Sequence, residues 1–114
     1  MPFEAGDIIC VPFPFTDRAA HKRRPALVLS VKNFNSQHMH LILAMVTSAD
    51  NPPWPSDVSI TDQTQAGLPS SSVVRMKLFT LDERLVLDVL GKLSRFDKAA
   101  VLKRMTTTFG ITRR

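Results

Sequence analysis

The sequence predicts a single, mainly β domain that ends in one α-helix. Short apolar stretches with strand-forming side chains recur along the chain, and turn-forming residues separate them. A strong helix signal comes only near the C-terminus, where Ser94 precedes an amphipathic stretch. At 114 residues the chain can bury one core but not two, so residues 1–114 are expected to form one domain. This pattern predicts a small barrel or strongly bent sheet covered by the terminal helix.

The first two strands are expected at about Asp7 to Pro14 and Pro25 to Lys32. Pro12 and Pro14 have no N–H to donate to a neighbouring strand, so the first strand should lie at an edge or carry a bulge. A basic loop joins the two strands, and such a loop could grip a polyanion or simply be solvated. Its charged residues are Asp17, Arg18, Lys22, Arg23 and Arg24.

The middle of the chain is expected to contain one central strand between two irregular segments. Asn33 to Gln37 is polar and predicts a turn or short irregular connection. His40 to Thr47 is almost continuously apolar, which favours a strand buried on both faces. Ser48 to Ser56 contains three prolines and Trp54, which predicts a loop. Trp54 could stack on a base, but packing on the core or in a subunit contact is favoured.

The next segment predicts two more strands. A short, half-exposed strand around Val58 is followed by a turn region from Asp62 to Ser70. Val73 to Phe79 is expected to form the longer strand. Its alternation places Arg75 and Lys77 on one face, which suggests a local basic patch.

The C-terminal part predicts a helical turn at Leu81 to Leu85, a last strand at Val86 to Leu93 and then the helix. Ser94 is a suitable N-cap, and Gly110 is placed to end the helix after Phe109. An apolar stripe at helical spacing is expected to pack on the core or in a dimer. The stripe consists of Ala99, Leu102, Met105 and Phe109.

Composition narrows the classes of partner. The net charge of +5 and the pI of about 10.0 favour nucleic acid, a membrane surface or an acidic protein. No apolar run reaches the roughly 20 residues that cross a bilayer, and the N-terminus lacks the features of a signal peptide. Cys10 is the single cysteine, so no intramolecular disulfide can form and a cytoplasmic location is predicted. Cys10 itself is expected in the core. His and Cys spacing gives no metal site, and no cofactor is expected.

The familiar enzyme motifs are missing from the sequence. It contains no phosphate-binding glycine loop and no Gly-x-Ser-x-Gly elbow. If the protein is an enzyme, it must therefore work without a cofactor. RNA cleavage meets this condition, because the substrate's 2′-hydroxyl can be the nucleophile and an arginine can stabilise the charge on the phosphate.

Several stretches of the chain resemble the MazF/PemK toxins of bacterial toxin–antitoxin systems. The similar stretches are GDIICVPFPFTD, KRRPALVLS, LILAMVTS, AGLPSSSVVRMKLFTLD and VLGKLS, in this order. The resemblance implies an SH3-like barrel of the CcdB/MazF type and a sequence-specific endoribonuclease that cleaves single-stranded RNA, with mRNA as the target class. It also implies a homodimer, an acidic antitoxin, and metal-free formation of 2′,3′-cyclic phosphate and 5′-hydroxyl ends.

The same resemblance implies which residues act. Arg24, directly before a proline, corresponds to the catalytic arginine, and Thr47 works with it, with Ser48 beside it. Arg75 takes part in some PemK-like members, which carry an acid two residues later, but this chain has Lys77 there. On physical grounds Arg24 stabilises charge first, since a free arginine is a poor base at neutral pH.

A histidine titrates in the useful range, so His21 is a candidate auxiliary acid or base, although an ordinary exposed loop histidine is the favoured interpretation. Two alternative functions also stay open. One is a CcdB-like toxin that binds DNA gyrase without nuclease activity. Phe109-Gly110-Ile111 is weakly similar to the Trp-Gly-Ile ending of such toxins. The other is a non-catalytic SH3-like module that binds nucleic acid or protein.

Overall fold

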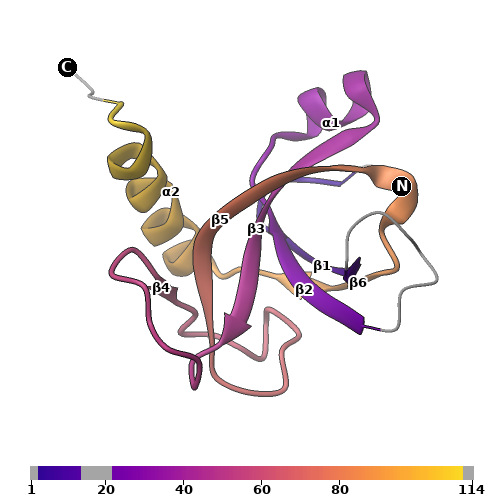
Figure 1. The fold of residues 1–114 in the computed structure, drawn as a ribbon. Coiled ribbons are helices and arrows are strands. Elements are labelled where there is room, and N and C mark those ends of the chain that lie inside the picture. The colour runs from indigo at the N-terminus through magenta and orange to yellow at the C-terminus, as the bar shows by residue number, and fades with distance from the viewer. Residues whose placement is uncertain (1–2, 14–21, 112–114) are drawn as a thin grey trace.

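The computed structural model describes residues 3–13 and 22–111. Six strands form one antiparallel sheet in the order β4-β5-β3-β2-β1-β6. The sheet bends into a half-barrel, with α2 beside β4 and β5 and the short α1 at the other end (Figure 1). This confirms the predicted mainly β fold with a C-terminal helix. The strands are β1 (Asp7–Phe13), β2 (Lys22–Val28), β3 (His40–Ser48), β4 (Val58–Ser59), β5 (Ser72–Asp82) and β6 (Asp88–Lys92). The helices are α1 (Lys32–His38), the 3-10 turn η1 (Glu83–Leu85) and α2 (Arg95–Phe109).

Strand β3 divides the core into two apolar clusters, one on each face of the sheet. Leu41 and Leu43 belong to one cluster, while Ala44 and Val46 belong to the other, which also receives Val101 of α2. Because β3 lies between β2 and β5, its nearly continuous apolar sequence covers both faces. The prediction of a central, doubly buried strand is confirmed.

Strand β1 is an inner strand that carries a bulge. It lies between β2 and β6, but β6 pairs only with Asp7 to Cys10, and the register shifts between Ile8 and Ile9. Pro12 lies beyond the last of these pairs, where no N–H is needed on that side. Of the two alternatives predicted for this strand, an edge position or a bulge, the structure shows the bulge. Pro14 lies outside the described residues.

The start of β2 and the structure of the segment before β3 differ from the predictions. Strand β2 begins at Lys22 rather than Pro25, because the basic residues before the proline pair with β1. The segment expected to be irregular forms α1 instead. Asn35, which is buried, ties this helix to the segments before β1 and after β2, since its Nδ2 donates to the carbonyls of Phe3 at 2.9 Å and Ser30 at 3.0 Å.

Helix α2 has the predicted ends but a different buried face. Ser94 caps the N-terminus by accepting from the Asp97 N–H, and Gly110 ends the helix at φ +67°. The buried residues of α2 are Asp97 and Val101. Asp97 determines which face of α2 is buried, because its carboxylate accepts hydrogen bonds from the loop that follows β4.

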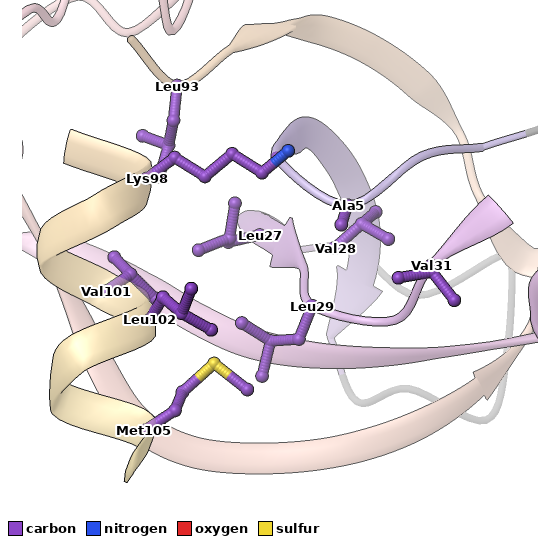
Figure 2. A pocket seen from close by; sticks show the side chains of 11 residues that line it. Ala5, Leu27, Val28, Leu29, Val31, Leu93, Lys98, Val101, Leu102 and Met105 are labelled. Atoms are coloured by element: carbon purple, nitrogen blue, oxygen red, sulfur yellow. The ribbon is translucent and has the colours of Figure 1, made fainter. Parts of the chain in front are cut away.

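Of the apolar stripe predicted on α2 to pack on the core or in a dimer, only Met105 packs against the core cluster. Ala99 is exposed, and Phe109 is 54% exposed. Leu102 and Met105 instead line an apolar groove of about 250 Å³ between α2 and β2, with Leu29 opposite them (Figure 2). Over the described part of the chain, α2 and the other helices are too short or too polar to cross a bilayer.

Candidate active site

A pocket opens where β2 and β3 separate. The two strands pair from Val28 opposite Leu43 to Ala26 opposite Met45. Pro25 directly precedes Ala26 in β2 and has no N–H to extend this ladder. Beyond this point β2 continues with β1 and β3 continues with β5. The resulting cavity measures about 300 Å³ and is lined by Arg23, Arg24, Pro25, Val46, Thr47, Ser48, Asn51, Leu68, Pro69, Ser70, Ser72 and Leu90.

Arg24 reaches this pocket from β2. It is half-buried and lies opposite Val11 of β1, while its guanidinium carbon is 4.8 Å from the centre of the Phe13 ring. A cation–π contact fixes the guanidinium without consuming its N–H donors. Extending the β2–β3 register by two residues would bring Arg24 level with Thr47. Arg24 is therefore held where its donors can serve an anion in the pocket.

Thr47 faces the same pocket from the end of β3. It is half-buried, and its Oγ1 accepts a hydrogen bond of 2.6 Å from Nδ2 of Asn51. The neighbouring Ser48, also predicted, lines the pocket, and its Oγ accepts from the backbone N–H of Asp50 at 3.1 Å. Asn51 was not predicted, because a lone asparagine before two prolines carries no recognisable motif.

Arg75 lies on β5 and is engaged elsewhere. Its Nε donates to Oδ1 of Asp57 at 3.0 Å, and its Nη2 donates to Oδ2 of Asp57 and to the Pro52 carbonyl, both at 2.9 Å. The hydrogen bond from Arg75 lowers the pKa of Asp57, and the same bond raises the pKa of Arg75. Asp57, directly before β4, thus supplies the acid that pairs with Arg75, while Lys77 is exposed.

The pairing with Asp57 also changes the basic patch expected on β5. Arg75 contributes no free positive charge there, because its guanidinium is neutralised by the bidentate carboxylate. The register of β3 and β5 shifts between Ala44 and Met45, so two residues of β5, Met76 and Lys77, have no residue of β3 opposite them.

The chain matches the family model of PemK-like, MazF-like toxins of type II toxin–antitoxin systems over residues 4–109. The protein belongs to this family.

Solved structures of MazF proteins share the whole fold. A MazF from Deinococcus radiodurans is 28% identical, with a TM-score of 0.75 over 97% of this chain and 99% of that one. A MazE–MazF complex from Deinococcus radiodurans gives 23% identity and a TM-score of 0.77 over 98% and 99% of the two chains. An endoribonuclease in complex with its cognate antitoxin, from a mycobacterial species, is 15% identical. Its TM-score is 0.77 over 99% of this chain and 98% of that one. A search of curated protein sequences found no match.

Further residues of this PemK/MazF-family chain can be placed around the pocket. Lys22 and Arg23 are exposed on β2, and Arg23 lines the pocket. Trp54 is 42% exposed and lies against the Arg75 guanidinium, whose carbon is 5.0 Å from the ring centre. It therefore packs on an ion pair and not on the core. The predicted residues Asp17, Arg18 and His21 lie outside the described residues.

Among the described residues, Cys10, His38 and His40 show no site of their own. Cys10 is half-buried, and this burial raises the pKa of its thiol. His40 Nδ1 lies 2.8 Å from the carbonyl oxygen of His38. Across residues 3–13 and 22–111, His, Cys, Asp and Glu side chains form no group of three or more that could hold a metal ion.

Proposed function

We propose that this chain is a toxin endoribonuclease that cuts single-stranded RNA, with mRNA as the target class, at a short sequence motif. The observation that supports it most is the shared pocket of Arg24 and Thr47 at the point where β2 and β3 separate. Membership of the PemK/MazF toxin family supports it from the whole chain, as do the structural neighbours named as endoribonucleases. An mRNA substrate would place the protein in the cytoplasm.

The proposed reaction uses the substrate's own nucleophile and needs no metal. The 2′-oxygen attacks the adjacent phosphorus, loses its proton, and expels the 5′-oxygen, which gains one. The products would be a 2′,3′-cyclic phosphate and a 5′-hydroxyl. Arg24 supplies positive charge and N–H donors to the phosphoryl oxygens, and the Thr47 hydroxyl adds a further donor. One well-placed donor of this kind is worth about 2.7–4 kcal/mol of transition-state stabilisation.

The other predicted residues have supporting roles in this proposal. Lys22 and Arg23 are exposed cations beside the pocket and suit the RNA backbone. Arg75 was predicted to be catalytic, but its donors to Asp57 and Pro52 favour a role in holding the loop. His21 stays the candidate for proton transfer.

We further propose a homodimer and an acidic antitoxin as partners. The net charge of +5 suits an acidic protein that competes with RNA for one cationic surface. Two of the three structural neighbours described above are complexes with an antitoxin or with MazE. On α2, Leu102 is 63% exposed and Phe109 is 54% exposed, and these apolar side chains suit a subunit contact.

The test is to incubate EDTA-treated protein with a long RNA and to map the cut ends. Arg24→Ala should abolish cleavage, whereas Arg95→Ala, which removes an exposed arginine of α2, should not. Thr47→Val should lower the cleavage rate. Thr80→Val, at an exposed position of β5, is its control and should not. Wild-type cleavage by Arg24→Ala would remove Arg24 from the site, and cleavage that needs added Mg²⁺ would contradict metal independence.

The two alternative functions give different results in the same preparation. A gyrase-binding toxin would inhibit DNA supercoiling and leave RNA intact. A non-catalytic module would bind RNA in a salt-sensitive manner without cutting it.

A further inference from the structure

Asn51 makes a short contact to the predicted catalytic hydroxyl. Its Nδ2 donates to Thr47 Oγ1 at 2.6 Å, and both residues line the pocket that Arg24 enters. A threonine hydroxyl has one hydrogen to donate and two lone pairs that accept. Because the Asn51 amide occupies one lone pair as a donor, it cannot also receive the hydroxyl hydrogen. That hydrogen is left for a different acceptor.

We propose that Asn51 is a positioning residue of the RNA-cleaving site, which orients the Thr47 hydroxyl so that it donates to the scissile phosphate. The inference rests on the proposed ribonuclease function. Asn51 acts through Thr47, by fixing the rotamer and the donor direction of the hydroxyl. The phosphate, when bound, would then receive hydrogen bonds from Arg24 on β2 and from Thr47 on β3.

The backbone around Asn51 is anchored on both sides. On one side, its N–H donates to the Ser48 carbonyl at 3.1 Å, which closes a turn directly after β3. On the other side, Pro52 restricts Asn51 to extended conformations, and the Pro52 carbonyl accepts from Arg75 Nη2 at 2.9 Å. The amide is therefore presented by a rigid segment, although Asn51 itself is exposed.

The anchor at Arg75 connects the loop to β5. Arg75 donates two hydrogen bonds to the Asp57 carboxylate, and its guanidinium also lies against Trp54. Trp54 and Asp57 close a second turn, with the Asp57 N–H donating to the Trp54 carbonyl at 3.0 Å. We call the contacts of Arg75 with Asp57, Trp54 and the Pro52 carbonyl the clamp. The clamp gives Arg75 a role in the site without phosphate contact, since it fixes the segment that carries Asn51.

The test is a double-mutant cycle on the cleavage rate. Asn51→Ala should lower kcat by about 3- to 10-fold, the effect of one lost hydrogen bond, and leave KM nearly unchanged. In a Thr47→Val background, the same change should have almost no effect, because the hydroxyl on which Asn51 acts is already gone. Asn33→Ala, an exposed asparagine of α1, is the matched control and should keep the wild-type rate in both backgrounds.

Asn51→Asp tests the direction of the hydrogen bond. An ionised carboxylate only accepts, so it would take the Thr47 hydrogen away from the phosphate and lower kcat at neutral pH at least as much as Asn51→Ala. Below about pH 4 the protonated carboxyl can donate again, and the loss relative to wild type should shrink.

Three outcomes overturn the inference. They are an equal loss for Asn51→Ala with and without the Thr47 hydroxyl, an unchanged kcat in Asn51→Ala, and wild-type cleavage by Asn51→Asp at neutral pH. The proposed function fails separately, if the wild-type protein leaves RNA uncut or if Arg24→Ala cuts it normally.

Discussion

Asp57 holds the guanidinium of Arg75 through two parallel hydrogen bonds, at 3.0 Å from Nε and at 2.9 Å from Nη2. Their side chains are only 10% and 13% exposed. Asp57 directly precedes β4 and Arg75 lies in β5, so the pair ties the proline-rich loop to the sheet. The same loop delivers Asn51 to Thr47, which links this ion pair to the geometry of the pocket.

The pH dependence of this clamp can be followed through Trp54, the only tryptophan in the chain. The hydrogen bond from Arg75 lowers the pKa of Asp57 from 3.8, so the clamp is fully formed above that value and is lost as the pH falls through the lowered one. Wild-type Trp54 fluorescence and its quenching by acrylamide should stay constant from neutral pH down to that range. Asp57→Asn removes the charge and should increase quenching at neutral pH, while Asp50→Asn should not. Quenching that is unchanged in Asp57→Asn would contradict the clamp.

Local signals explain what the sequence predicted of the fold. The ends of α2 follow from a serine that caps and a glycine that adopts positive φ, and both signals act within one turn of helix. The central position of β3 follows from its apolar residues on both faces. Neither inference requires knowledge of which segments meet in space.

The misplaced elements depend on contacts between distant segments. Helix α1 is stabilised by Asn35, whose partner Phe3 lies 32 residues away in sequence. The buried face of α2 is set by Asp97, whose partner Thr61 lies 36 residues away. An apolar stripe on α2 could not reveal this, because a buried aspartate reads as a surface residue in a helical pattern.

The candidate site likewise contains residues that the sequence predicted and residues that only the structure reveals. The resemblance to MazF/PemK toxins pointed to Arg24 and Thr47, and the structure brings both into one pocket. Asn51 and Asp57 could not be found in the sequence, because their importance comes only from where the loop folds back. The resemblance implies an acid two residues after Arg75, where this chain has Lys77, whereas the pairing of β4 with β5 brings Asp57 to Arg75.

Asp97→Ala should destabilise the protein strongly. Asp97 is 1% exposed, and its carboxylate accepts from the Thr61 N–H at 2.9 Å, the Thr61 hydroxyl at 2.7 Å and the Asp62 N–H at 3.1 Å. Removing it leaves these donors unsatisfied, at an expected cost of roughly 2–4 kcal/mol in the free energy of unfolding. Urea unfolding gives this value. Asp50→Ala, at an exposed loop position, is the control and should change it little.

The same residue predicts a pH effect on stability. Burial raises the pKa of Asp97, but hydrogen bonds from Thr61 and Asp62 outweigh burial, so the pKa lies below its ordinary value. The stabilisation is therefore present at neutral pH and is lost as the pH falls through this lowered pKa. Asp97→Ala should lose less stability than wild type on acidification. Parallel acid sensitivity of the two proteins would assign the effect to other groups.

Asn35→Asp should separate the role of the buried amide from helix propensity. The two Nδ2 donors of Asn35 face the carbonyl oxygens of Phe3 and Ser30, and a carboxylate there would bring negative charge against both. We expect a loss of roughly 3 kcal/mol in the free energy of unfolding at neutral pH. Asn33→Asp makes the same change at an exposed position of the same helix and should have little effect. Equal losses in the two variants would show that the helix, and not the buried contact, is responsible.

Gly67→Ala should damage the wall of the candidate site. Gly67 has φ +74°, and a Cβ built there would lie 2.0 Å from the carbonyl oxygen of Leu90, a backbone atom that cannot swing away. Its neighbour Leu68 and Leu90 itself both line the pocket of Arg24 and Thr47. We expect a loss of more than about 2 kcal/mol in the free energy of unfolding, together with reduced RNA cleavage by the fraction that still folds.

A matched glycine separates the steric clash from backbone strain. Gly110 has a similar φ of +67°, but a Cβ there would meet no atom within 4 Å. Gly110→Ala should therefore cost only the strain of the left-handed conformation, about 1–2 kcal/mol, and leave cleavage intact. The difference between the two variants in urea unfolding measures the close approach at Leu90. If Gly67→Ala is no more destabilising than Gly110→Ala, the turn before Leu68 can move away from β6, and the pocket is less rigid than the contact at Leu90 requires.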